Sequence, residues 1–98
     1  MEGAMTNTKL EEFIQELNRF ADEVYEGNNV EISSFVQEII PQIAAISELI
    51  KDDSLNNKLL NNALSPMLIG LEENDQIYIA DIITFELLSI LDEIKNTI

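Results

Sequence analysis

The sequence of 98 residues contains no cysteine, no histidine and no tryptophan, and it has only 5 basic residues against 19 acidic ones. Without cysteine the chain forms no disulfide, which fits a reducing cytoplasm. Without histidine it lacks the commonest general base and metal ligand. The formal net charge of −14 disfavours binding to a phosphate backbone, since that binding depends on Lys and Arg displacing counterions. We therefore expect a cytoplasmic protein with no nucleic-acid partner and no affinity for an anionic membrane.

Long apolar runs are also missing. The longest uncharged stretch, residues 59–71, has thirteen residues and is interrupted by Asn61, Asn62 and Pro66, whereas a membrane-spanning helix needs about 20 mostly apolar residues. The first residues have neither the basic start nor the apolar run of a signal peptide. A second methionine, Met5, follows Gly-Ala and indicates that residues 1–4 are an expression remnant. We treat residues 1–7 as a flexible tail and residues 8–98 as one domain.

Apolar residues recur at steps of three and four along most of the chain. This spacing is typical of amphipathic helices and predicts four of them, at about residues 8–26, 30–51, 54–73 and 75–97. No strand pattern competes with it. Short connections favour antiparallel neighbours, so the expected fold is an all-α, up-down antiparallel four-helix bundle.

Capping residues predict the ends of the first two helices. Thr8 followed by Glu11 has the spacing of a capping box, and Gly27 is suited to end the first helix. Asn28 and Glu31 repeat the capping spacing before the second helix.

A proline and further capping residues mark the later helices. Pro41 lies inside the second helix and is expected to kink it, while the uncharged residues 39–47 predict its most buried part. Asp53 or Ser54 is the expected N-cap of the third helix, and Asp75 that of the fourth.

The fourth predicted helix is apolar on more than one face, and such a helix is normally surrounded. Either a second copy of the chain or a partner protein would cover the excess surface, unless the helix is simply central in a monomer. The residues that we predict to form this interface lie on the second and fourth helices: Ile39, Ile43, Ile46, Tyr78, Ile79, Ile82 and Phe85.

Carboxylates are the only abundant functional groups. Asp81 lies within the apolar fourth helix and is a possible buried acid, hydrogen-bonded to a helix end or to Tyr78; the alternative is a solvated position between two packing faces. The other acids lie where helix caps and solvated faces explain them. We therefore expect no catalytic residue, no cofactor and no metal site, and we expect that the protein is not an enzyme.

Residues 75–88 read Asp-Gln-Ile-Tyr-Ile-Ala-Asp-Ile-Ile-Thr-Phe-Glu-Leu-Leu. This segment resembles the C-terminal Asp-x5-Asp-x3-[Tyr/Phe]-Glu-Leu-Leu pattern of an uncharacterised family of small acidic helical proteins from low-GC Gram-positive bacteria. Phe85 stands where tyrosine is usual, and Ser89 where proline is usual. The resemblance implies a helical fold and carries no known activity.

The leading functional hypothesis is a non-catalytic protein-interaction module, a small acidic adaptor or chaperone-like protein that buries a partner or its own copy on the second and fourth helices. One alternative is an acidic nucleic-acid mimic that occupies a basic protein. A second alternative is a carboxylate–metal hydrolase, which would pair acids on helices.

Overall fold

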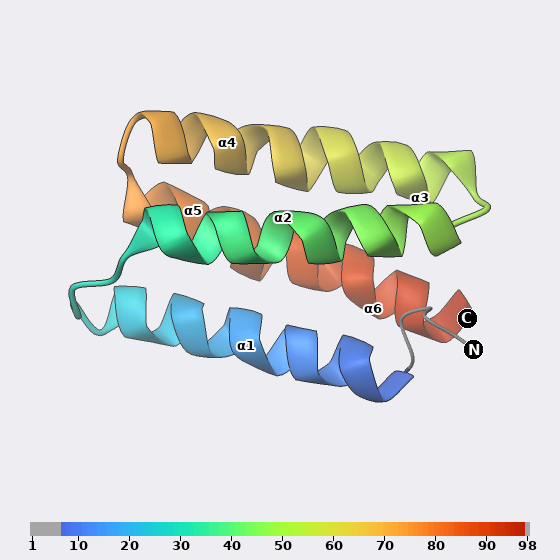
Figure 1. The fold of residues 1–98 in the computed structure, drawn as a ribbon, viewed down its shortest axis with the longest axis horizontal. Helices are drawn as coiled ribbons and strands as arrows, with labels where there is room; N and C mark the ends of the chain where they lie inside the picture. The colour runs from blue at the N-terminus through green and yellow to red at the C-terminus, as the bar shows by residue number, and fades with distance from the viewer. Residues whose placement is uncertain (1–6, 98) are drawn as a thin grey trace.

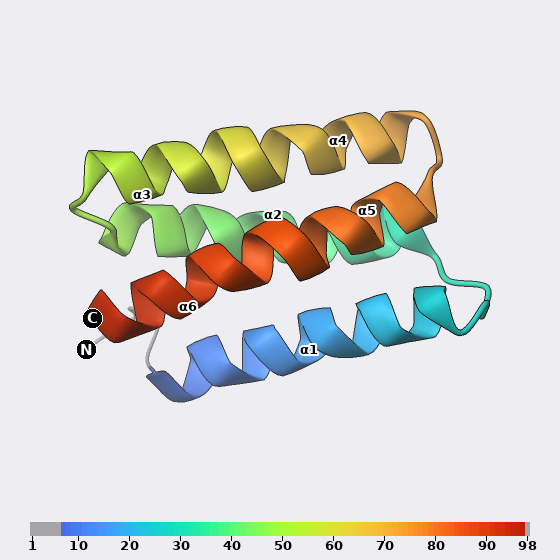
Figure 2. The same cartoon turned by 180° about the vertical axis from the view of Figure 1, so that it is seen from behind.

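The computed structural model describes residues 7–97, with side chains for residues 8–96, as four packed helices without a strand. Each helix runs back along the preceding one (Figures 1 and 2). We name α3–η1–α4 the third helix and α5–η2–α6 the fourth helix, because η1 and η2 are π-helical segments within them. The elements are α1 (Asn7–Tyr25), α2 (Ile32–Leu49), α3 (Asp53–Lys58), η1 (Leu59–Leu64), α4 (Ser65–Glu72), α5 (Gln76–Ile82), η2 (Ile83–Leu87) and α6 (Leu88–Thr97). The prediction of an all-α four-helix bundle is confirmed.

The starts of the first two helices differ from the prediction. Because α1 already includes Asn7, Thr8 lies within its first turn and is not its N-cap. Residues 1–6 lie outside the described residues, so the flexible tail predicted there stays a prediction. Asn7, the last residue of the predicted tail, is helical. The N-cap of α2 is Glu31, which makes no side-chain capping bond, so the capping role predicted for Asn28 is wrong.

Gly27 ends α1 as predicted. Its φ of +85° is the left-handed conformation that glycine adopts without a steric penalty. The Asn28 amide donates to the Glu23 carbonyl at 3.0 Å, and the Gly27 amide donates to the Val24 carbonyl at 3.0 Å. These two bonds form a Schellman motif, which satisfies carbonyls that the helix end leaves unpaired.

The connection between the third and fourth helices uses the same motif, with Asn74 at a φ of +55°. Asp75 follows at once and caps the fourth helix, because its carboxylate accepts a hydrogen bond from the Tyr78 amide at 3.0 Å. The predicted N-cap at Asp75 is confirmed.

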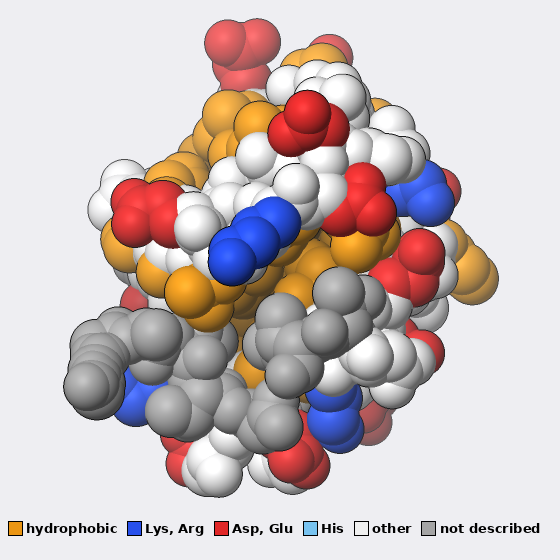
Figure 3. All heavy atoms as spheres, turned by 90° about the vertical axis from the view of Figure 1, so that its right-hand side faces the viewer, with side chains coloured by type: hydrophobic (Ala, Val, Ile, Leu, Met, Phe, Trp, Pro, Cys, Tyr) orange, Lys and Arg blue, Asp and Glu red, His pale blue; other side chains and the backbone are white. Residues whose placement is uncertain are grey.

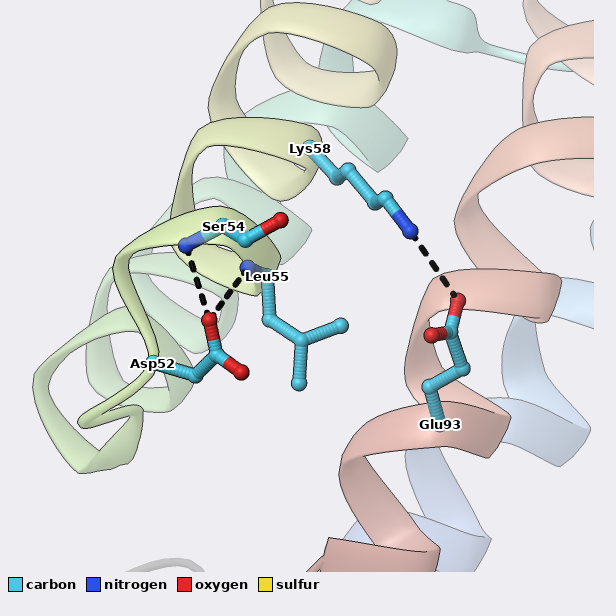
Figure 4. Close-up of polar contacts among 5 residues, drawn as sticks. All are labelled: Asp52, Ser54, Leu55, Lys58 and Glu93. Carbon is cyan, nitrogen blue, oxygen red and sulfur yellow. Dashed lines mark hydrogen bonds and ion pairs between the residues drawn. The ribbon is translucent and has the colours of Figure 1, made fainter.

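Asp52 is the N-cap of the third helix. Its carboxylate accepts hydrogen bonds from the amides of Ser54 at 2.8 Å and Leu55 at 3.3 Å (Figure 4). The cap therefore precedes the predicted Asp53 by one residue.

The core stripes of the third and fourth helices advance in steps of four. An α-helix has 3.6 residues per turn, so each such step overshoots a full turn by roughly 40°. The wider π-helical turns of η1 and η2 correct this drift, and the two segments pack against each other. The stripes consist of Leu55, Leu59, Ala63 and Met67, and of Ile79, Ile83, Leu87 and Leu91, all buried.

Stacked aromatic rings join α1 to α2. The rings of Phe20 and Phe35 lie with centroids 3.8 Å apart and planes inclined by 6°. No buried polar or charged side chain interrupts the core within residues 8–96. Seen from the end of the bundle where α3 begins, hydrophobic side chains lie between the helices and carboxylates lie on the outside (Figure 3). None of the described helices combines the length and apolar composition that crossing a membrane requires.

Candidate interaction surface

Four of the seven predicted interface residues lie in the chain's own core. Their side chains are fully buried or nearly so and pack against the other helices: Ile39, Ile43, Ile46 and Ile79. Neither a partner nor a second copy reaches them in this conformation, so placing them at an interface was wrong. The reason is that each of these residues belongs to the apolar stripe of its helix, and the four helices already enclose these stripes.

The other three predicted residues lie at the surface of the fourth helix. Phe85 is 70% exposed and Tyr78 is 37% exposed, while Ile82 is half-buried. Phe85 stands two positions from the buried residues Ile83 and Leu87, which places it on the opposite side of the helix. The structure therefore separates the predicted set into a core part and a surface part.

The third helix carries an apolar surface that was not among the predicted interface residues. Leu60, Leu68 and Ile69 are 37%, 42% and 51% exposed. Between Lys58 and Glu72 the helix has no charged residue. Nine apolar residues other than proline lie between Leu55 and Leu71, which is too many for one stripe, and that excess was the available signal. Among the described residues, the third and fourth helices thus each carry three exposed large hydrophobic residues, and α2 carries none.

A hydrogen bond shows which side of the third helix meets α2. The Ser47 hydroxyl donates to the Asn56 side-chain oxygen at 2.6 Å. Helical spacing places Ile40 and Ala44 on the Ser47 side of α2, and Leu60 and Leu64 on the Asn56 side of the third helix. We call the resulting surface the neutral face and define it by six residues: Ile40, Ala44, Leu60, Leu64, Leu68 and Ile69.

The uncharged residues 39–47 of α2 contribute to this surface and are not buried on every side. Pro41, Ala44 and Ala45 are exposed, so the prediction that this stretch is the most buried part of the helix holds only for its core stripe. The helix continues through Pro41, and the predicted kink stays a prediction.

Acidic residues lie at both edges of the bundle. Helix α1 lies at one edge and the third helix at the other, with α2 and the fourth helix between them (Figures 1 and 2). The acids of α1 and of the turn that follows it are Glu11, Glu12, Glu16, Asp22, Glu23 and Glu26. These six acids stand against two bases on α1, whereas residues 52–73 hold four acids, at the two ends of the third helix, against one base. Both edges are therefore acidic, and the third helix is uncharged only between Lys58 and Glu72.

Asp81 connects the fourth helix to α1. The Tyr25 hydroxyl donates to Asp81 Oδ1 at 2.5 Å. The carboxylate is half-buried, and its partner is neither of those predicted, a helix end or Tyr78.

The surroundings of Tyr25 change its acidity. Partial desolvation of the hydroxyl raises the pKa of Tyr25 above its ordinary value of 10.0, and both the hydrogen bond to Asp81 and the negative charge of Asp81 add to this rise. A hydrogen bond with Thr84 acts in the opposite direction. The contact is a partly exposed polar link between α1 and the fourth helix.

Within residues 8–96, no three acidic side chains lie close enough to share a metal ion. Residues 5–97 match the model of a family described as a domain of unknown function (DUF8042). No curated protein and no solved structure matches the chain.

Proposed function

Since the chain belongs to this family of unknown function, we propose from its structure that it is a non-catalytic protein-interaction module that binds through the neutral face. The neutral face replaces the surface first expected on the second and fourth helices. Tyr78 and Phe85 of that first surface remain exposed on the fourth helix.

The observation that carries the proposal is the uneven distribution of exposed apolar side chains. Seven large hydrophobic residues are exposed among those described, and six of them belong to the third and fourth helices. Scattered apolar residues are normal on a surface, whereas a group of them on adjacent elements is typical of a protein-binding site. The acids elsewhere keep such a surface soluble.

No contact in the structure favours either alternative, the acidic nucleic-acid mimic or the carboxylate–metal hydrolase. The proposal also includes finer points that rest on the sequence: a cytoplasmic location, an origin in low-GC Gram-positive bacteria, and residues 75–88 as the family's C-terminal signature.

The test is a pull-down from a lysate of the source organism with three tagged baits: wild type, Leu68→Glu and Gln15→Glu. Leu68 lies on the neutral face, whereas Gln15 is exposed on α1, so both variants add one negative charge at the surface. Each protein recovered is identified by mass spectrometry and purified, and its affinity for each bait is measured by calorimetry.

We expect a stoichiometric protein that binds wild type and Gln15→Glu equally and binds Leu68→Glu at least tenfold more weakly. Equal binding by all three baits would place the interaction elsewhere and contradict the proposal. Recovery of no protein, including no untagged copy of the chain itself, would also contradict it.

A further inference from the structure

We infer that the outer side of the fourth helix is a second binding surface, and that its partner is a basic amphipathic helix of another protein. We call this surface the aromatic face and define it by five residues: Tyr25, Ile77, Tyr78, Asp81 and Phe85. The fourth helix lies on the side of the bundle turned away from α2, whereas the neutral face lies along α2 and the third helix (Figure 2). The inference goes beyond the proposed function and does not require the neutral face to bind.

A contact between helices brings α1 into this face. The Tyr25 hydroxyl donates to Asp81 Oδ1 and also shares a hydrogen bond with Thr84, so Tyr25 lies against the α1 side of the fourth helix. Ile77, Asp81 and Phe85 follow one another at steps of four, which places them along one side of that helix. The half-buried Asp81 therefore lies among three exposed apolar side chains.

Tyr78 extends the face toward the third helix. A β-carbon on Gly70 would lie 3.0 Å from its Cδ2, so the ring rests against α4 at this point. Both tyrosines of the chain and one of its four phenylalanines thus belong to the aromatic face, and Phe85 is the most exposed of the large hydrophobic residues described. Aromatic side chains bury a large area with few rotatable bonds, and they often carry much of the binding energy at protein interfaces.

The lysines of the chain gather at the other end of the bundle. This is the end where α1 and the third helix begin and where α2 and the fourth helix end (Figure 1). The lysines are Lys9, Lys51, Lys58 and Lys95. Two of them neutralise acids there, since Lys58 pairs with Glu93 and Lys95 with Glu11, each at 3.8 Å.

The acids around the aromatic face have no such partners in the nearby sequence. Residues 20–50 and 59–94 contain neither Lys nor Arg. Arg19 lies six positions before Tyr25, roughly a third of a turn around α1, and therefore points to another side of that helix. The exposed acids that flank the face in the chain or in the preceding turn are Asp22, Glu26, Glu72, Glu73, Asp75 and Glu86.

This charge selects the partner. A ring of unpaired carboxylates around apolar side chains attracts a segment that carries Lys and Arg on both sides of an apolar stripe. A second copy of the chain would bring the same acids against themselves, because a two-fold contact places identical patches together. The expected occupant is therefore a basic segment of a different protein.

The backbone of the occupant indicates that it is a helix. The aromatic face consists of helices, whose backbone hydrogen bonds are internal, so it offers side chains alone. An extended peptide would bury unpaired backbone groups there, whereas a helix pairs its own. Ile77 and Phe85 are eight positions apart, roughly 12 Å along the axis, a length that two to three turns of a partner helix span.

The probe is a synthetic amphipathic helix of about 18 residues made of leucine and lysine, since shorter isolated helices are marginal in water. One control peptide has the same composition in an order without helical periodicity, and the other has glutamate in place of lysine. The chain has no tryptophan, and its two tyrosines, Tyr25 and Tyr78, both belong to the aromatic face. Its tyrosine fluorescence therefore reports on this face while each peptide is titrated at about 0.15 M salt.

We expect the basic amphipathic peptide to bind at least tenfold more tightly than either control peptide. Phe85→Ser should weaken this binding at least tenfold. The matched variant Leu68→Ser on the neutral face should leave the dissociation constant within about twofold of wild type. Both side chains are exposed, and far-ultraviolet circular dichroism of each variant verifies that the helices remain folded.

A second pair of variants tests the contribution of charge. Glu26→Gln/Glu73→Gln removes two exposed acids beside the aromatic face, whereas Glu12→Gln/Glu48→Gln removes two exposed acids nearer the lysines. The first pair should weaken binding of the basic peptide several-fold more than the second. Equal effects would show that the peptide responds to net charge alone and would overturn the inference.

The outcomes separate this inference from the proposed function. A basic amphipathic peptide that does not bind up to millimolar concentration, or that binds Phe85→Ser as tightly as wild type, would overturn the aromatic face and leave the neutral face untouched. Equal weakening by Phe85→Ser and Leu68→Ser would overturn the aromatic face as a separate surface. Binding of the non-periodic peptide as tight as that of the amphipathic one would overturn the helical partner.

Discussion

At the scale of single residues, the contact between Tyr25 and Asp81 is the polar link with the greatest separation in sequence among the described hydrogen bonds. It ties the end of α1 to the start of the fourth helix. A hydroxyl that donates to a carboxylate holds its proton more firmly, because the nearby negative charge opposes a second one. The contact therefore changes the pKa of Tyr25, which a titration can measure.

We predict that Tyr25 titrates above pH 10 in the folded protein. The chain has two tyrosines, so Tyr78→Phe leaves Tyr25 as the only one, and its ultraviolet absorbance then reports its ionisation directly. The midpoint should lie above 10.0 and should fall on adding Asp81→Ala, which removes two of the causes that raise the pKa. A midpoint unaffected by Asp81→Ala would show that Asp81 does not act on this hydroxyl.

The same shift affects stability in a defined direction. Because the folded pKa of Tyr25 lies above the unfolded one, the folded state binds this proton more tightly. The contribution is fully present below about pH 10 and is lost as the pH rises from about 10 through the folded pKa. Tyr25→Phe should remove this part of the alkaline loss of stability, which urea titrations at several pH values will reveal.

At the scale of elements, α4 lies close against α5 at Gly70. A β-carbon there would lie 2.7 Å from Ile79 Cγ1 and 3.0 Å from Tyr78 Cδ2. Both neighbours belong to the first turns of the fourth helix, and Ile79 is buried, so it has little room to move.

We therefore predict that Gly70→Ala destabilises the protein by about 1–3 kcal/mol, as overpacked cores usually are. Without this close contact, alanine in a helix would stabilise the protein by up to about 1 kcal/mol relative to glycine. The sign of the change in unfolding free energy therefore shows whether the contact is present. Urea denaturation measures the change. The matched control is Asn57→Ala on the same helix, which is exposed and should be neutral or slightly stabilising. A Gly70→Ala variant as stable as wild type would contradict the close contact.

Much of the element structure could be predicted from the sequence. Periodicity located all four helices to within about two residues, and Gly27 and Asp75 marked their boundaries correctly, because these residues act through local backbone geometry. The π-helical segments were not predicted. Core residues spaced four apart in the third and fourth helices indicate these π-helical segments. This spacing can be recognised only once it is known which residues face the core.

At the scale of the whole molecule, every helix carries acidic residues, and residues 59–71 form the longest uncharged segment. The acids of α1 lie across the molecule from the uncharged part of the third helix. The longest dimension of the protein is 38 Å, and the Debye length is about 30 Å at 0.01 M salt but about 10 Å at 0.1 M. At low salt the acids therefore repel one another across most of the protein.

We predict that the melting temperature rises by several degrees between about 0.01 M and 0.1 M sodium chloride, equivalent to about 1 kcal/mol. A triple variant with Glu12, Glu16 and Glu23 changed to glutamine should show a smaller rise, because it carries less charge on α1. Melting curves at two protein concentrations separate this effect from association. Equal melting temperatures at both salt concentrations would show that the charges are already well dispersed.

The interaction surface was predicted less well than the fold. Sequence patterns indicate that a helix has excess apolar residues, but they do not say which neighbours cover them. Ile39 and Ile79 looked like candidates for an interface and are core residues, whereas Leu60 and Leu68 follow the apolar spacing of the third helix and are exposed. Only the arrangement of the four helices decides between these two environments.

The pairing of α1 with the fourth helix has a consequence for the order of folding. The other extensive contacts between helices join α2 to the third helix and the third helix to the fourth, which are consecutive in the chain, and such local contacts form early. The pairing of α1 with the fourth helix closes the longest loop, so its entropic cost is the highest. The contacts between Tyr25 and Asp81, and between Lys95 and Glu11 at 3.8 Å, therefore belong to the last stage of assembly.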